Sequence, residues 1–205
     1  MRFIGITGGI GAGKSEILSY IGKHYRCRIY LADEVAHLVK EPGTDCFLRL
    51  TALLGREILT PEGRIDKKKM AEKIFADREL LEKVNAIVHP AVKVFLMEKL
   101  EEARKEGNVD FFFVEAALLI EGGYGTLVDE MWYIYASEEV RRKRLKEARG
   151  YSDEKITAIM QKQLAEADFR KNCSFVIDNS GSLEESCRQI DKRLNSAEME
   201  IAWQK

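Results

Sequence analysis

Ile6-Thr7-Gly8-Gly9-Ile10-Gly11-Ala12-Gly13-Lys14-Ser15 is the stretch of sequence that decides the fold. From Gly8 to Ser15 it fits the phosphate-loop pattern G-x-x-x-x-G-K-[S/T]. The apolar residues 2–7 before it predict a buried strand, and residues 15–21 after it have helical spacing. A strand that passes through a glycine turn into a helix directs unpaired N–H groups at one point, which favours anions.

This loop predicts a bound nucleoside triphosphate. Lys14 is expected to reach the β- and γ-phosphates, and the Ser15 hydroxyl is expected to hold Mg²⁺. The alternative is a glycine-rich turn that begins a helix and binds nothing. The loop alone does not say what is done with the nucleotide.

Length and composition indicate one well-buried α/β domain with room for an insertion or a lid. The 205 residues include 33 Lys and Arg against 34 Asp and Glu, a net charge of −1, so bulk nucleic-acid binding is not indicated. The longest apolar runs are too short to span a membrane. The four cysteines show no C-x-x-C spacing, so neither zinc nor a disulfide framework is expected. We expect a cytoplasmic protein with reduced thiols, as a monomer or a weak homo-oligomer.

Five short apolar runs predict the strands of a sheet, at residues 2–7, 27–31, 110–115, 131–136 and 175–178. The run from 110 to 115 is continuously apolar, as buried parallel strands are. Residues 45–107 are mostly helical, with an apolar stripe that continues past His89-Pro90, where Pro90 starts a new helix or kinks the old one. His89 has the features of a structural hydrogen-bonding residue, and the alternative is a catalytic residue. The prediction is a single domain with its core at about 1–32, 108–136 and 170–195, an acceptor-binding helical region at about 33–107, and a lid at about 137–169.

Two acidic positions follow predicted strands, where a parallel sheet binds its ligands. Asp33 is placed to accept a proton from a substrate hydroxyl, to act as a helix N-cap, or to do both. Glu115 is placed to support the Mg²⁺ shell or to position a substrate; the alternative is an acid satisfied by solvent.

The helix predicted over residues 138–149 is strongly basic. A phosphate-facing ridge through Arg141, Arg144 and Arg149 suits arginine, whose planar fork binds phosphate oxygens in pairs. The alternative is a solvated or RNA-contacting helix. A GTP switch is not indicated, because the chain lacks the guanine-reading segment N-K-x-D. A basic helix after the fourth strand instead favours the lid of a small-molecule kinase, which excludes water from the reaction.

Further motifs carry a more specific resemblance. They are the loop itself, Ala32-Asp33 with His37, Gly63-x-Ile65-Asp66, His89-Pro90, Leu118-Leu119 with Glu121, Arg144-Leu145 with Arg149, Gln163, and Ile177-Asp178-Asn179-Ser180-Gly181. With these motifs in this order, the chain resembles the dephospho-coenzyme A kinase family over roughly residues 3 to 185. The resemblance implies a P-loop NTPase three-layer sandwich, with a five-stranded parallel sheet between helices. It also implies transfer of the ATP γ-phosphoryl group to the ribose 3′-hydroxyl of dephospho-CoA, the last step of CoA synthesis.

The resemblance also assigns roles to residues. It implies that Asp33, Lys14 and Arg144 are catalytic. It implies that ATP is bound by Gly9, Ile10, Gly11, Ala12, Gly13, Lys14, Ser15, Arg144, Arg149 and Asn179, the last near the adenine. The acceptor would be bound by His37, Lys67, His89, Leu118 and Glu121, and Mg²⁺ by Ser15 and Glu115.

The chain departs from the family pattern at several positions. Leu31 stands where the family has Asp, Lys67 where it has Arg, and Arg141 where it has Gln; Glu115-Ala116-Ala117 replaces Asp-x-Pro, and Cys173-Ser174 replaces Ala-Asp. Lys14, Ser15 and Asp33 are all kept. Two alternatives stay open: a kinase for another nucleotide or nucleoside, and an ATP-binding regulator that does not catalyse.

Overall fold

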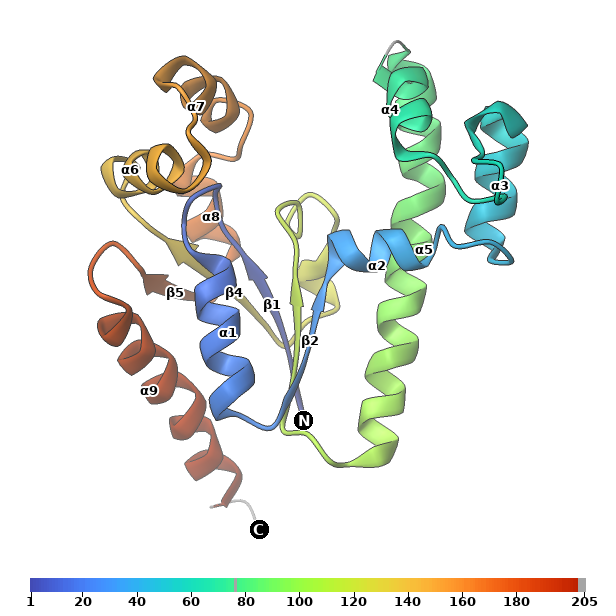
Figure 1. Cartoon of the computed structure of the whole chain (residues 1–205). Helices are drawn as coiled ribbons and strands as arrows, with labels where there is room; N and C mark the ends of the chain where they lie inside the picture. Colours follow the sequence, from blue (N-terminus) through green and yellow to red (C-terminus); the bar gives the residue numbers. More distant parts are fainter. Residues whose placement is uncertain (76, 203–205) are drawn as a thin grey trace. The chain divides into compact units, whose positions relative to one another are not determined.

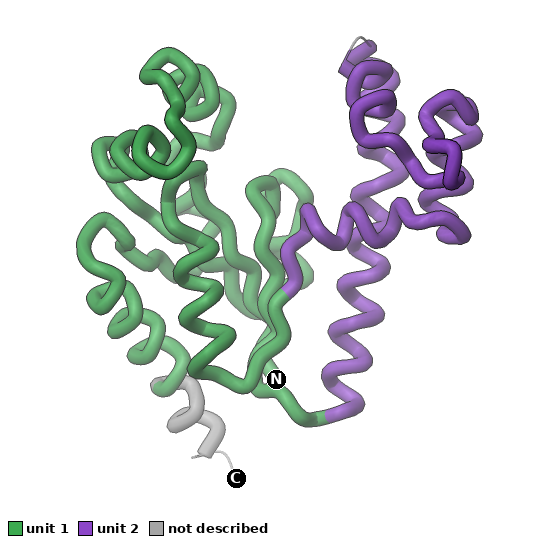
Figure 2. Tube along the Cα trace, in the orientation of Figure 1, with its two compact units in different colours: residues 1–29, 107–205 green, residues 30–106 purple. Residues whose placement is uncertain are grey.

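The computed structural model describes residues 1–75 and 77–202, with side-chain detail up to residue 195. The chain divides into two compact units (Figure 2). The first contains residues 1–29 and the residues from 107 onward, and the second contains residues 30–106. The second unit thus coincides closely with the predicted helical insertion. Its treatment as part of a single domain stays a prediction.

The sheet has five strands, in the order β2-β3-β1-β4-β5. The strands are β1 (Arg2–Thr7), β2 (Cys27–Leu31), β3 (Phe111–Glu115), β4 (Glu130–Tyr135) and β5 (Phe175–Asp178). β1 pairs in parallel with β3 and β4, and β4 pairs in parallel with β5. Consecutive residues of β1 are buried, as expected for a central parallel strand with both faces covered. The predicted α/β class and five-stranded parallel sheet are confirmed.

The helices of the first unit surround the sheet (Figure 1). They are α1 (Lys14–His24), α6 (Glu138–Arg149), α7 (Asp153–Met160), α8 (Glu166–Asn172) and α9 (Leu183–Ala202), with a short 3₁₀ helix η2 (Tyr124–Thr126). On β4, Tyr133 stacks on Phe169 of α8, with ring centroids 4.6 Å apart. Glu130 of the same strand pairs with Arg193 of α9 at 3.1 Å. Tyr133 and Glu130 are three residues apart on β4, so their side chains point to opposite faces of the sheet. α8 and α9 therefore cover opposite sides of β4.

Local sequence fixes where these helices begin. The Ser152 hydroxyl accepts from the backbone N–H of Lys155 at the start of α7. Ser182 and Glu185 form a reciprocal capping box at the start of α9, in which each side chain accepts from the other residue's backbone N–H. All four cysteines are free thiols, and no helix in the described ranges combines the length and apolar character needed to cross a membrane.

The second unit is helical. It contains α2 (Ala32–Leu38), α3 (Asp45–Leu54), a 3₁₀ helix η1 (Arg56–Ile58), α4 (Lys67–Phe75) and α5 (Arg78–Glu106), and α2, α3 and α4 all pack against α5. Of the two alternatives for Pro90, the start of a new helix is wrong, because α5 runs through it without a break, and a kink stays a prediction. Pro90 is exposed, whereas Val84, Val88 and Val92 are buried one turn apart. We infer that packing along this buried stripe maintains the helix despite the lost backbone donor.

Candidate active site

The phosphate loop joins β1 to α1, as the sequence predicts. Gly13 is the N-cap of α1 and has a left-handed backbone with φ 89°. A Cβ atom there would also collide with the amide nitrogen of Asn179. At Gly8 a Cβ atom would lie 2.5 Å from the carbonyl oxygen of Ile134 on β4. Glycine is therefore required at Gly13 by conformation and space together, and at Gly8 by space.

Lys14 lies across its own loop. Its ammonium donates to the carbonyl oxygen of Gly8 at 2.8 Å and lies 3.5 Å from the Glu115 carboxylate. The β1–β3 register produces this proximity, since Ile6 is paired with Glu115 at the carboxyl ends of the two strands. Glu115 is thus paired inside the protein, and the alternative of an acid satisfied by solvent alone is wrong.

The oxygen donors expected to hold Mg²⁺ are Ser15 and Glu115. Ser15 is exposed in the first turn of α1, and its hydroxyl has no hydrogen-bond partner among the described residues. In those residues no group of three or more His, Cys, Asp or Glu side chains forms a metal cage. One hydroxyl and one carboxylate fit Mg²⁺, which keeps several waters and takes further ligands from substrate phosphates.

Asn179 lies beneath the loop and is 1% exposed. Its amide nitrogen donates to the carbonyl oxygen of Ala12 at 2.8 Å, and its amide oxygen accepts from the Ser186 hydroxyl at 2.8 Å. Its side chain therefore holds the loop in position by linking Ala12 to Ser186 of α9. Contact between Asn179 and the adenine of ATP stays a prediction.

Two arginines of α6 reach the loop. Arg144 donates to the carbonyl oxygen of Asn179 at 2.9 Å and to that of Ala12 at 3.4 Å. Arg141 donates to the carbonyl oxygen of Ile10 at 2.8 Å and to the Gln163 side-chain oxygen at 2.8 Å. That same Gln163 oxygen accepts from the backbone N–H of Ile10 at 3.1 Å, so Arg141 and Gln163 enclose one residue of the loop.

The ATP-binding set inferred from the sequence left out Arg141. Helical spacing did place Arg141 beside Arg144 on the predicted phosphate-facing ridge, because residues i and i+3 share a helix face. Arg149 is the last residue of α6 and is exposed. Its guanidinium is 5.9 Å from the centroid of the Tyr151 ring. Leu118 and Glu121 are exposed in the turns that follow β3.

In the second unit, Asp33 is the second residue of α2 and is exposed. The N-cap of α2 is Leu31, with no side-chain capping bond, so the N-cap interpretation of Asp33 is wrong. His89 is exposed on α5 and, within the described ranges, its side chain has no hydrogen-bond partner. This argues against its interpretation as a structural hydrogen-bonding residue.

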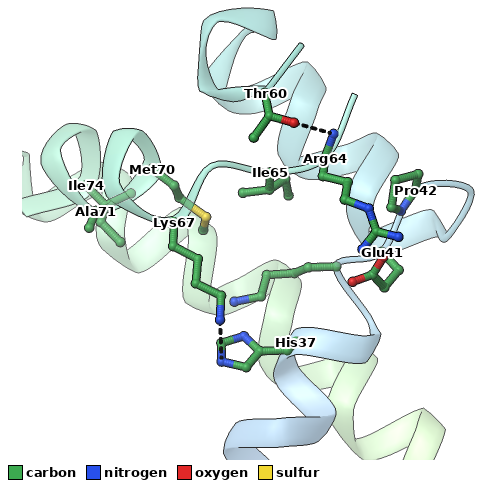
Figure 3. A pocket seen from close by; sticks show the side chains of 11 residues that line it. His37, Glu41, Pro42, Thr60, Arg64, Ile65, Lys67, Met70, Ala71 and Ile74 are labelled. Carbon is green, nitrogen blue, oxygen red and sulfur yellow. Dashed lines mark hydrogen bonds and ion pairs between the residues drawn. The ribbon is translucent and has the colours of Figure 1, made fainter. Parts of the chain in front are cut away.

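His37 and Lys67 meet at a pocket within the second unit, with a volume of about 550 Å³ (Figure 3). The His37 Nε2 atom lies 3.4 Å from the Lys67 ammonium. The lining also includes Lys40 and an ion pair between Arg64 and Glu41 at 2.9 Å. The remaining lining residues are Pro42, Thr60, Ile65, Met70, Ala71 and Ile74.

Comparison with known proteins identifies close relatives of this chain. The family model described as dephospho-CoA kinase matches residues 2–185. A dephospho-CoA kinase of Dehalococcoides mccartyi is 37% identical over 192 residues, covering 93% of this chain and 96% of that protein. A crystal structure of a Thermus thermophilus protein is 30% identical with a TM-score of 0.77, covering 95% of this chain and 97% of the other. A dephospho-CoA kinase structure from Campylobacter jejuni, 23% identical, matches the fold with a TM-score of 0.71 over 95% and 96% of the two chains.

Proposed function

Because this chain belongs to the dephospho-CoA kinase family, we propose that it transfers the γ-phosphoryl group of ATP to the ribose 3′-hydroxyl of dephospho-CoA. The products are CoA and ADP, and we place the reaction in the cytoplasm as the final step of CoA synthesis. The observation that carries the donor half is the phosphate loop, with Lys14 and Ser15 at the start of α1.

The reaction breaks the bond between the γ-phosphorus and the β–γ bridging oxygen, and forms a bond from that phosphorus to the 3′-oxygen. Such transfer depends mainly on positioning and charge stabilisation. Lys14 and Arg144 supply positive charge to the phosphates, and Asp33 orients the 3′-hydroxyl and accepts its proton. Ser15, with Glu115 in support, would hold Mg²⁺, which when bound would neutralise developing charge on the phosphate oxygens.

Direct assay of the reaction tests the proposal. The protein is incubated with ATP, Mg²⁺ and dephospho-CoA, and the product is analysed for a 3′-phosphate. We expect one CoA per ADP formed. ADP formation without CoA would reject the assignment, and preference for another nucleoside in an acceptor panel would reassign the acceptor.

Asp33→Asn tests the proposed base. We expect kcat to fall by about 10²–10⁴-fold, the usual effect of losing a general base, with ATP affinity unchanged. Glu34→Gln is the matched control, because Glu34 is the neighbouring acid and is also exposed in the first turn of α2. Equal losses in the two variants, or no loss in Asp33→Asn, would contradict the role of Asp33.

A further inference from the structure

The positively charged side chains that reach the phosphate loop do not all contact the same kind of group. Arg141 and Arg144 donate to neutral oxygens, which belong to backbone carbonyls and to one side-chain amide. Lys14 instead faces a carboxylate, because its ammonium lies 3.5 Å from Glu115. Glu115 therefore places a negative charge at the point where the loop is expected to bind a polyanion.

Two features fix the Glu115 carboxylate beside Lys14. The β1–β3 register pairs Ile6 with Glu115, and the Ala116 N–H then donates to the Ile6 carbonyl oxygen at 3.2 Å. Both side chains of the ion pair are only 16% exposed, so water and salt screen this pair less than they screen a surface pair. An anion that binds Lys14 therefore also interacts with the charge of Glu115.

The effect of Glu115 on ATP depends on whether the nucleotide carries a metal ion. Metal-free phosphates compete with Glu115 for Lys14 and approach its carboxylate, and like charges at close range oppose binding. When the phosphates carry Mg²⁺, the same carboxylate faces a cation that prefers oxygen ligands and holds them directly or through its waters. The contribution of Glu115 to ATP binding therefore changes sign when the metal is present.

We propose that Glu115 makes the phosphate loop selective for the metal-bound form of ATP by opposing the metal-free form. Selectivity of this kind combines a repulsive contact against the wrong ligand with an attractive contact for the right one. The ion pair contributes, because metal-free ATP takes Lys14 from Glu115 and leaves the carboxylate without a cation. The inference rests on the proposed function, in which ATP is the donor, and specifies the form of ATP that the donor site accepts.

Calorimetry with a non-hydrolysable ATP analogue tests the inference by binding alone. The Kd is measured in excess Mg²⁺ and in excess chelator, and the ratio of the metal-free Kd to the metal-bound Kd measures the selectivity. Glu115→Gln keeps the size of the side chain but removes its charge, so we expect the metal-free Kd to fall about tenfold. The Kd with Mg²⁺ should not fall. An unchanged ratio, or weaker metal-free binding in this variant, would overturn the inference.

Glu16→Gln is the matched control for that measurement. Glu16 lies in the first turn of α1, two residues after Lys14, and is exposed. Within the described part of the chain its side chain has no ion-pair partner. Because solvent screens an exposed charge, we expect the ratio in this variant to stay within about twofold of that of the unchanged protein. An equal fall of the ratio in both variants would contradict a specific role for Glu115.

Glu115→Asp tests whether the charge of the side chain, rather than its packing, produces the selectivity. This variant keeps a carboxylate at the end of β3 and shortens the side chain by one methylene, so most of the ratio should be retained. If Glu115→Asp loses the ratio as fully as Glu115→Gln does, the effect comes from packing and the inference fails. The melting temperature of each variant without nucleotide checks that the protein is folded.

The outcomes distinguish this inference from the proposed function. If the protein binds the ATP analogue with the expected change of ratio but makes no CoA, the role of Glu115 stands and the kinase assignment fails. If the protein makes CoA but Glu115→Gln leaves the ratio unchanged, this inference fails alone. If the analogue binds neither with nor without Mg²⁺, both are rejected.

Discussion

Arg141 connects α6 to a single residue of the phosphate loop, Ile10. Its guanidinium holds the carbonyl oxygen of Ile10 and the Gln163 side chain that binds the same residue's N–H. Arg141→Ala removes both contacts, so more loop conformations must be ordered when ATP binds. We expect the Kd for a non-hydrolysable ATP analogue with Mg²⁺ to rise about tenfold, corresponding to about 1.4 kcal/mol, measured by calorimetry.

Arg142→Ala is the control for that prediction. Arg142 is the next residue of α6 and bonds Glu138 and Thr157, away from the loop. Tighter binding of the analogue by Arg141→Ala would show that the guanidinium competes with ATP. That result would contradict the prediction that Arg141 orders the loop for ATP binding. Sequence predicted that arginines of this helix face phosphate, but not that Arg141 would hold the loop, because that contact depends on Gln163, 22 residues further along.

Among the elements, α1 and α9 are joined by a shared carboxylate. Asp191 of α9 accepts from the hydroxyls of Tyr20 and Tyr25, each at 2.7 Å. Asp191→Ala leaves both hydroxyls without this partner, and hydrogen bonds to a charged group contribute roughly 1.5–3 kcal/mol. We expect the free energy of unfolding, measured in urea at pH 7, to fall by about 2 kcal/mol, while Glu184→Ala, an exposed acid on the same helix, changes it little. Equal losses would contradict the shared-carboxylate role.

The same contact predicts an alkaline transition. Burial, followed by the hydrogen bond to Asp191, raises the pKa of Tyr20 from 10.0 to about 12. Because the folded state holds this proton more tightly, the contribution is complete below pH 10 and is lost as the pH rises toward 12. Absorbance titration should show one tyrosine ionising at a lower pH in Asp191→Ala than in the unchanged protein, and still above pH 10 because its burial remains. An unaltered titration would exclude the linkage.

Among the secondary-structure elements, the sequence predicted best those whose bounds depend on local sequence. The bounds of β1, β2 and β5 match the predicted runs, and α6 matches the helix predicted over residues 138–149. The helix across Pro90 was harder to anticipate, because a local rule against proline was outweighed by packing of α5 against three other helices. That Lys40 lines the pocket of the second unit could not be predicted for a related reason: no motif marks it, and only the folding of residues 37–74 around one cavity reveals it.

For the molecule as a whole, the two compact units are expected to respond to different ligands. A ligand slows hydrogen exchange where it stabilises local structure. We expect an ATP analogue with Mg²⁺ to protect residues 8–15 and α6 of the first unit, and 4′-phosphopantetheine, which is a part of the proposed acceptor, to protect α2 and α4 of the second. Mass spectrometry of amide exchange reports each segment separately. In Lys67→Met the protection of the second unit should disappear and that of the first should remain. Protection of residues 8–15 by 4′-phosphopantetheine would show instead that its phosphate binds at the donor site, which would contradict the expectation that the two substrates protect different units.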